Sequence, residues 1–174
     1  MIMKYEVWIE RISYYLDKIS RIFVVILMII MFVLVLITIA NRFIFHFSFS
    51  WSEEIARYLF IWIIMIGIGI AEIEGSHVAL ELPFIKKRTN SWIKLTTRMM
   101  MLIFFIIVIW NGISSSLFLF QKYQTSAVSG IPMYLIFVSI PIGFGILAIH
   151  TLVEIESIFK TSMNERLMKE RKYK

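Results

Sequence analysis

Three charged side chains, Glu53, Glu54 and Arg57, lie at the start of an apolar segment within the stretch SFSWSEEIARYLFIW at residues 48–62. Two neighbouring carboxylates could act as a general acid/base pair or bind a metal ion. Consecutive residues on a helix point about 100° apart, however, so these two carboxylates do not converge on one substrate or ion. We therefore predict no catalytic or metal site here and expect that the protein is not an enzyme.

The composition is that of a membrane protein. The chain has 174 residues, of which 59% are hydrophobic and 17% charged, and its mean hydropathy is +0.80. Soluble domains carry about 25% charged residues. There are no cysteines, which excludes disulfides, thiol redox chemistry and thiolate metal sites. The first apolar run is too long for the core of a signal peptide, so we expect the first helix to be retained.

Uncharged runs mark the helices that must position the charged cluster. Crossing about 30 Å of hydrocarbon takes roughly 20 helical residues, and the run at residues 58–71 is too short unless its helix begins inside the cluster. Residues 50–53 read Ser-Trp-Ser-Glu, a capping-box pattern that predicts a helix start near Trp51. We predict an all-α integral membrane protein, a single domain over residues 1–174 with transmembrane helices at 22–41, 51–72, 99–121 and 130–153.

The basic residues predict how these helices are oriented. Of the 18 lysines and arginines, all but Arg42, Arg57 and Lys122 lie in the N-terminal segment, the loop between helices 2 and 3, and the C-terminal tail. Positively charged loops stay in the cytoplasm, so we predict cytoplasmic termini and an outward-facing charged cluster. The net charge of +6 then suits anionic membrane lipid, and we expect no nucleic-acid partner.

Two terminal segments flank the predicted spans. In residues 1–21, apolar side chains recur at three- and four-residue steps, which indicates an amphipathic N-terminal helix. This helix either lies along the cytoplasmic membrane surface or extends the first transmembrane helix. Residues 160–174 form a charged cytoplasmic tail, which we expect to fray.

The middle of the membrane is nearly free of ionisable side chains. Ion and proton pathways usually carry such residues, yet the long uncharged runs contain only His150, near the inner end of helix 4. Asn111 and Gly112 in helix 3, and Gly143 and Gly145 in helix 4, are residue types that more often make helix–helix contacts than bind substrate. We predict packing roles for these four residues. The alternative is a broken transporter helix in the fourth span.

The three histidines do not suit a haem. Coaxial ligation needs two histidines that face each other at similar depth. The predicted topology puts His46 outside, whereas His77 lies in the inner loop and His150 at the inner end of helix 4. Only His77 and His150 share a side, so we expect no cofactor.

The charged cluster and its flanks resemble one known family. The run NRFIF at residues 41–45 precedes SWSEEIARYLFIW at residues 50–62 and GIGIAEIEGSHVALELP at residues 67–83. Together these motifs resemble the small permease subunit of TRAP transporters, the tripartite ATP-independent periplasmic family. The resemblance covers residues 15–160, although helices 3 and 4 match only in hydropathy.

The resemblance implies a subunit that widens the static scaffold of a secondary transporter in the bacterial inner membrane. A large membrane subunit would carry the substrate and sodium sites and move as an elevator, and a periplasmic binding protein would deliver an organic acid, a sialic acid or a dicarboxylate. Two other classes stay open. An anchor subunit of a respiratory or other enzyme complex predicts histidines at matched depth, and a stand-alone transporter predicts charges at mid-membrane.

The charged cluster then has two interpretations. Arg57 lies about one turn inside the apolar zone and needs a partner, and Glu53 is placed to form an i, i+4 pair with it. Arg42 ends helix 1 and is close enough in sequence to reach Glu53 and Glu54. The cluster either locks helix 1 to helix 2 or also contacts the large subunit or the binding protein. In both cases Trp51 anchors helix 2 at the outer interface.

Overall fold

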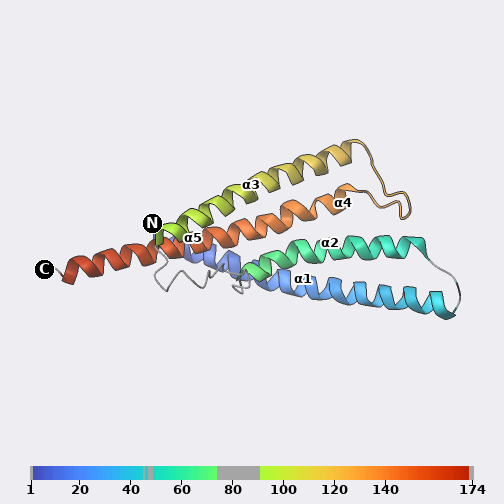
Figure 1. Ribbon diagram of the computed structural model, residues 1–174, viewed down its shortest axis with the longest axis horizontal. Coiled ribbons are helices and arrows are strands. Elements are labelled where there is room, and N and C mark those ends of the chain that lie inside the picture. The colour runs from blue at the N-terminus through green and yellow to red at the C-terminus, as the bar shows by residue number, and fades with distance from the viewer. Residues whose placement is uncertain (1, 45, 47–48, 74–90, 173–174) are drawn as a thin grey trace.

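Long helices run side by side in the computed structural model, which describes residues 2–44, 46, 49–73 and 91–172 (Figure 1). The elements are α1 (Ile2–Ile44), α2 (Ser50–Ile73), α3 (Ser91–Gln121), α4 (Tyr134–Phe137) and α5 (Ser139–Lys172). Four segments are long and apolar enough to cross a membrane: Ser13–Ile44, Ser50–Glu72, Leu95–Gln121 and Tyr134–Glu156. The prediction of an all-α protein with four membrane-spanning helices is confirmed.

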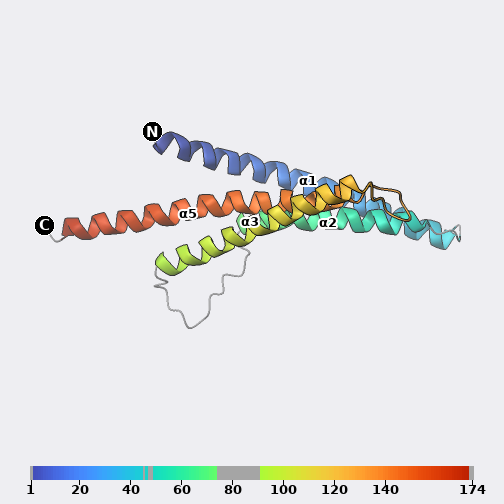
Figure 2. The ribbon, with the colours of Figure 1, turned by 90° about the horizontal axis from the view of Figure 1, so that it is seen from above.

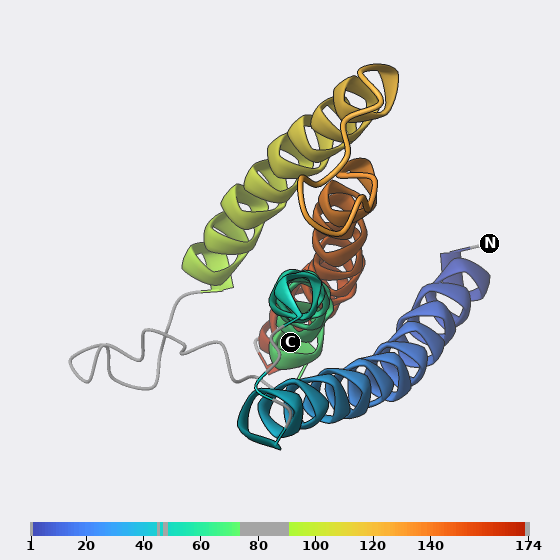
Figure 3. The ribbon, with the colours of Figure 1, turned by 90° about the vertical axis from the view of Figure 1, so that its right-hand side faces the viewer.

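The helices form a single curved row in the order α3, α5, α2, α1 (Figure 3). Each helix packs against the next, and α1 also touches α5. Within the described part of the chain, α1 and α3 make no contact with each other. The two middle helices are therefore covered on two sides, whereas α1 and α3 form the edges of the row.

Close contacts at glycines hold α5 between its neighbours. A Cβ atom on Gly112 of α3 would lie 2.9 Å from Cδ of Pro141 in α5, and one on Gly143 of α5 would lie 2.2 Å from the carbonyl oxygen of Met65 in α2. Small residues let membrane helices approach this closely, and van der Waals packing then drives their association. Gly145 differs, because a Cβ there would meet nothing within 4 Å.

For two further residues, the contacts in the structure differ from what their residue types suggest. Gly69, which the sequence did not single out, faces α5, since its Cβ would lie 2.7 Å from Cγ2 of Ile146. Asn111 makes no contact of this kind: it is exposed and donates its amide N–H to the carbonyl of Ile107 in its own helix, at 2.8 Å. The structure thus places Gly112 and Gly143 between helices, and places Asn111 on the outside of α3.

The fourth span is a helix with an interruption near its N-terminal end. The sequence predicts a helix over residues 130–153, whereas the structure has α4 and α5 with an interruption at Val138. Pro141 causes it, because proline has no amide hydrogen and its ring clashes with the carbonyl four residues earlier. Ser139, just after the interruption, is buried and donates its hydroxyl to the carbonyl of Ile136, at 2.6 Å.

The helices extend further than the apolar runs. α1 is continuous from Ile2 to Ile44, so the N-terminal segment extends the first span, which is the second of the two alternatives. α3 begins at Ser91 rather than near Met99. α5 continues to Lys172 through the tail that we expected to fray, because this tail is rich in Glu, Arg, Lys and Met, which are strong helix formers. Figure 2 shows the N-terminal part of α1 and the C-terminal part of α5 leaving the row at the same end.

Candidate functional site

Glu54 ties α2 to the connection between α3 and α4 at residues 122–133, which we call the outer hairpin after its predicted side of the membrane. Its carboxylate accepts hydrogen bonds from the hydroxyls of Tyr58 and Ser126. It also accepts one from the backbone N–H of Ser129, at 2.8 Å. Hydrogen bonds to an ionised acceptor are stronger than neutral ones. A single carboxylate therefore holds the hairpin against the first turns of α2.

The outer hairpin has a defined shape of its own. Thr125 and Pro132 form an antiparallel bridge, and the N–H of Ser126 donates to the carbonyl of Ile131 at 2.9 Å. Gly130 turns the chain with a φ of +68°, a value that glycine adopts without strain. The hairpin is thus preorganised to present its two serines to Glu54.

The other charged residues of the cluster do not join Glu54. Arg42, Glu53 and Arg57 are all exposed, and none of them takes part in an ion pair within 4.0 Å among the described residues. At the membrane edge an arginine can extend its charged end into water, where an exposed ion pair adds little. Among the described residues, the structure therefore brings neither arginine within ion-pair distance of a carboxylate.

Aromatic and hydroxyl side chains shape the start of α2. Trp51 is partly exposed, and its ring centroid lies 5.5 Å from that of Phe49. Ser52 is buried and donates its hydroxyl to the carbonyl of Phe49 at 2.6 Å. α2 thus begins where the sequence predicts, with Trp51 in its first turn.

A second tie, at the opposite end of α2 from Glu54, was not predicted. Arg98 of α3 pairs with Glu72 at the end of α2 and with Glu154 of α5, at 2.7 Å. The side chain of Glu72 is only 4% exposed. One guanidinium therefore joins α3 to both α2 and α5. Among the described residues, α2 and α3 do not otherwise pack against each other. The sequence showed Arg98 only as one of many basic residues near the inner loop, and no local spacing links it to either carboxylate.

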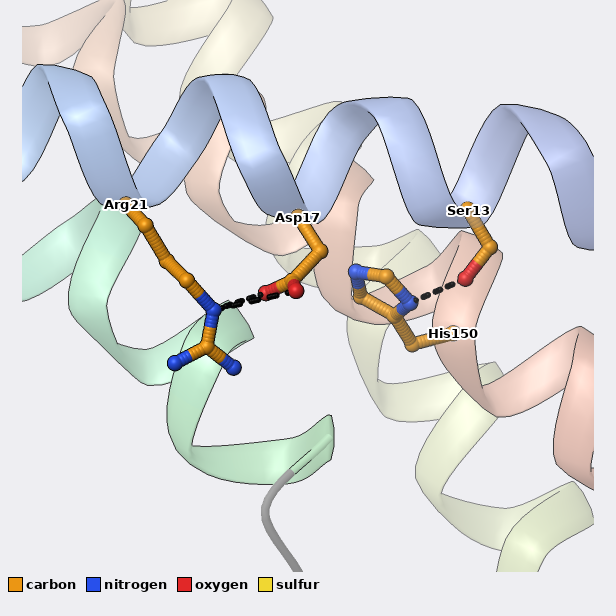
Figure 4. A network of polar contacts seen from close by, with 4 residues as sticks. All are labelled: Ser13, Asp17, Arg21 and His150. Atoms are coloured by element: carbon orange, nitrogen blue, oxygen red, sulfur yellow. Dashed lines mark hydrogen bonds and ion pairs between the residues drawn. The ribbon is translucent and has the colours of Figure 1, made fainter.

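The N-terminal part of α1 joins α5 through a histidine (Figure 4). Ser13 and Nδ1 of His150 share a hydrogen bond of 2.8 Å. One turn along α1 from Ser13, Asp17 accepts from Nε of Arg21 at 2.9 and 3.0 Å. His150 is buried, and its Nε2 atom has no hydrogen-bond partner among the described residues. In this structure His150 is thus a packing residue between two helices.

The structure offers no metal or haem arrangement within the residues that it describes. His46 is exposed at the opposite end of the row from His150, and His77 lies outside the described residues. No group of three or more His, Cys, Asp or Glu side chains in the described ranges could hold a metal ion. The polar side chains that are brought together serve contacts between helices.

Residues 31–161 match the family model described as Tripartite ATP-independent periplasmic transporters, DctQ component. This is most of the chain, from within the first span to just beyond the fourth. The chain belongs to the DctQ family. It is therefore a small membrane subunit of a TRAP transporter, as its motifs indicated. No curated protein matches the chain.

Both ties of this DctQ subunit lie inside the matched residues. The match includes Glu54 with its outer hairpin, and it includes Arg98 with the two carboxylates of the inner tie. The N-terminal part of α1, with Ser13 and Asp17, lies outside it. DctQ subunits work in tripartite complexes with a large membrane subunit and a periplasmic binding protein. The family is a class of transporter components and not a class of enzymes.

Proposed function

We propose that this chain is the small scaffold subunit of a sodium-coupled, binding-protein-dependent secondary transporter for an organic acid of the sialic acid or dicarboxylate type. Its partners are a large elevator-type membrane subunit, which carries the substrate and sodium sites, and a periplasmic substrate-binding protein. The chain lies in the bacterial inner membrane with both termini in the cytoplasm. It carries no cofactor and no sodium ion of its own.

The observation that carries this proposal is that α2 is fastened at both of its ends. Glu54 binds the outer hairpin, and Glu72 pairs with Arg98, which also reaches Glu154. Between these ties, Gly69 packs closely against α5. A scaffold subunit has to remain rigid while its partner moves against it. Contacts that fix both ends of α2 support this scaffold role.

The exposed members of the charged cluster are available to a partner. Arg42, Glu53 and Arg57 lie at the outer end of the row and make no ion pair among the described residues. The binding protein approaches from the outside in the proposed topology, and exposed charges steer such encounters. These three residues therefore contact the binding protein or the outer loops of the large subunit.

Reconstitution in liposomes tests the proposal. The small subunit alone takes up no labelled organic acid, and uptake appears with the large subunit, the binding protein and an inward sodium gradient. Uptake by this chain alone would refute the scaffold role. Equal uptake by the large subunit and binding protein without this chain would refute it as well. Replacing the sodium gradient by a potassium gradient tests the coupling ion.

A substitution of Arg57 tests whether this residue contacts a partner or only stabilises the folded subunit. Arg57→Ala should reduce uptake while the amount of small subunit that co-purifies with the large subunit is unchanged. Lys18→Ala is the matched control, because Lys18 is also an exposed basic residue but lies at the inner end of α1. A loss of folded subunit in proportion to the lost uptake would leave Arg57 with a structural role only.

A further inference from the structure

The side of α3 that faces away from α5 carries polar residues, at positions where a lipid-facing helix would be apolar. Trp110, Asn111 and Ser114 are exposed and Ser115 is half-buried, and the exposed fraction of Trp110 is 73%. We call these four residues the polar face of α3. Their spacing of i, i+1, i+4 and i+5 puts them on one side of the helix. The opposite side of α3 packs against α5 around Gly112.

The polar face lies inside the hydrocarbon layer. α3 crosses the membrane over Leu95–Gln121. At about 1.5 Å per residue, all four residues lie within about 11 Å of the middle of that span. The hydrocarbon core extends about 15 Å to either side of its midplane. Water is therefore not available to these side chains as a hydrogen-bond partner.

Several hydrogen-bonding groups on the polar face are unused. The indole N–H of Trp110 and the hydroxyls of Ser114 and Ser115 have no hydrogen-bond partner among the described residues. Asn111 uses one N–H on its own helix, through the carbonyl of Ile107. Unpaired polar groups are unfavourable in hydrocarbon, and acyl chains cannot satisfy them. A protein surface with donors and acceptors of its own can.

The other edge of the row provides an internal comparison. Every exposed side chain of α1 between residues 22 and 37 is apolar: Ile22, Phe23, Val25, Ile26, Met28, Ile29, Ile30, Phe32, Val33, Val35, Leu36 and Ile37. Such a surface suits acyl chains and needs no partner. The exposed side of α3 is also mostly apolar, but near the middle of its span it carries Asn111 and Ser114, and α1 exposes no polar residue between residues 22 and 37.

A groove lies beside the polar face, where a side chain of a partner helix could bind. It has a volume of about 490 Å³, is open along one side, and is lined by Ser114, Ser115, Phe118, Leu119 and Phe137. Serines let helix backbones approach closely and form hydrogen bonds across the contact. Aromatic side chains such as Trp110 are enriched at the centres of protein interfaces.

We propose that the polar face of α3 and this groove bind a transmembrane helix of the large membrane subunit. This inference rests on the proposed function, which supplies a partner inside the membrane. A soluble binding protein does not reach this depth. The partner helix carries hydrogen-bonding side chains that pair with Asn111, Ser114 and Ser115. The row of four helices is then attached to its partner by the α3 edge, while α1 faces lipid.

Site-directed photo-crosslinking in native membranes locates the contact. p-Benzoylphenylalanine replaces Trp110 in one variant and Phe32 of α1 in the other. Both native residues are exposed aromatics, 73% and 63% respectively, and both lie near the middle of their spans. With the large subunit epitope-tagged, we expect an adduct of the two subunits from position 110 and none from position 32.

Other crosslinking results would overturn the inference. An adduct with the large subunit from position 32 alone would place the contact on α1. A product at twice the 20.6 kDa mass of the chain, formed from position 110, would show that a second copy covers α3. Position 110 crosslinking only to lipid would show that α3 is an ordinary lipid-facing helix.

A bulky substitution tests the same contact without a probe. Ser114→Phe adds an aromatic ring at an exposed position outside the packing of the chain itself, so the subunit folds but the groove is filled. We expect about tenfold less small subunit to co-purify with the tagged large subunit. Val33→Phe on α1, also at an exposed position, should leave co-purification unchanged.

The two proposals fail in different ways. If the wild-type chain does not co-purify with the large subunit, the proposed function fails and the inference fails with it. If the wild-type chain co-purifies and Ser114→Phe does so equally well, only the assignment of the contact to α3 is wrong.

Discussion

Replacing Gly143 by alanine tests the close packing of α5 on α2. The new Cβ would lie 2.2 Å from the carbonyl oxygen of Met65 and 2.7 Å from its carbonyl carbon. Both atoms belong to the backbone of α2, so no change of side-chain rotamer relieves the overlap. Reaching ordinary contact distance requires the two helices to separate by about 1 Å, in an interior that is otherwise close-packed.

The size of the effect follows from two opposing contributions. Overpacking of this kind costs about 1–3 kcal/mol. Alanine in a helix interior gains about 1 kcal/mol over glycine. Gly145→Ala isolates the second contribution, because a Cβ at Gly145 meets nothing within 4 Å. The difference in unfolding free energy between the two variants therefore measures the overpacking alone, about 1–3 kcal/mol in favour of Gly145→Ala.

Thermal unfolding of the purified subunit in detergent measures this difference. A change of 1 kcal/mol shifts the melting temperature by about 2–4 °C for a protein of this size. Gly143→Ala should thus melt about 2–12 °C below Gly145→Ala. Equal melting temperatures would refute the reasoning, because they would mean that α2 and α5 do not approach each other as closely at Gly143 as the structure shows.

Three other predictions concern the ties and the topology. Glu54→Ala should speed amide hydrogen exchange in the outer hairpin, while Glu53→Ala, on an exposed residue without a hydrogen bond among those described, should not. Arg98→Gln should lower the melting temperature by at least about 5 °C, because it removes a cation from the nearly buried Glu72, and Arg98→Lys should lower it less. In a chain without native cysteines, Tyr123→Cys should react with a membrane-impermeant thiol reagent in intact cells, and Arg11→Cys only after permeabilisation; the reverse pattern would invert the topology.

The sequence by itself determined the four spans. A helix in hydrocarbon satisfies its own backbone hydrogen bonds locally, so its length and apolar content suffice to find it. The shortness of the run at residues 58–71 even required the helix to begin at the charged cluster, and α2 does begin at Ser50. The family could also be inferred from the sequence, because its motifs lie in one continuous stretch around the second span.

Helix ends outside the hydrocarbon were harder to predict. Beyond the membrane there is no requirement for apolar residues, so the runs that mark the spans say nothing about where a helix stops. The early start of α3 at Ser91 and the continuation of α5 to Lys172 depend on helix propensity and on contacts of the ends instead.

Only the tertiary structure decided which polar and small residues meet. Glu54 has Arg57 nearby in sequence, yet it binds Ser126 and Ser129 of the outer hairpin, because the order of helices in the row brings the hairpin to α2. Gly143 and Gly145 are the same residue type on one helix, yet only the first meets α2. Such contacts depend on how each helix is rotated and which helix lies beside it, and a single sequence with apolar residues on every side of its helices does not specify either.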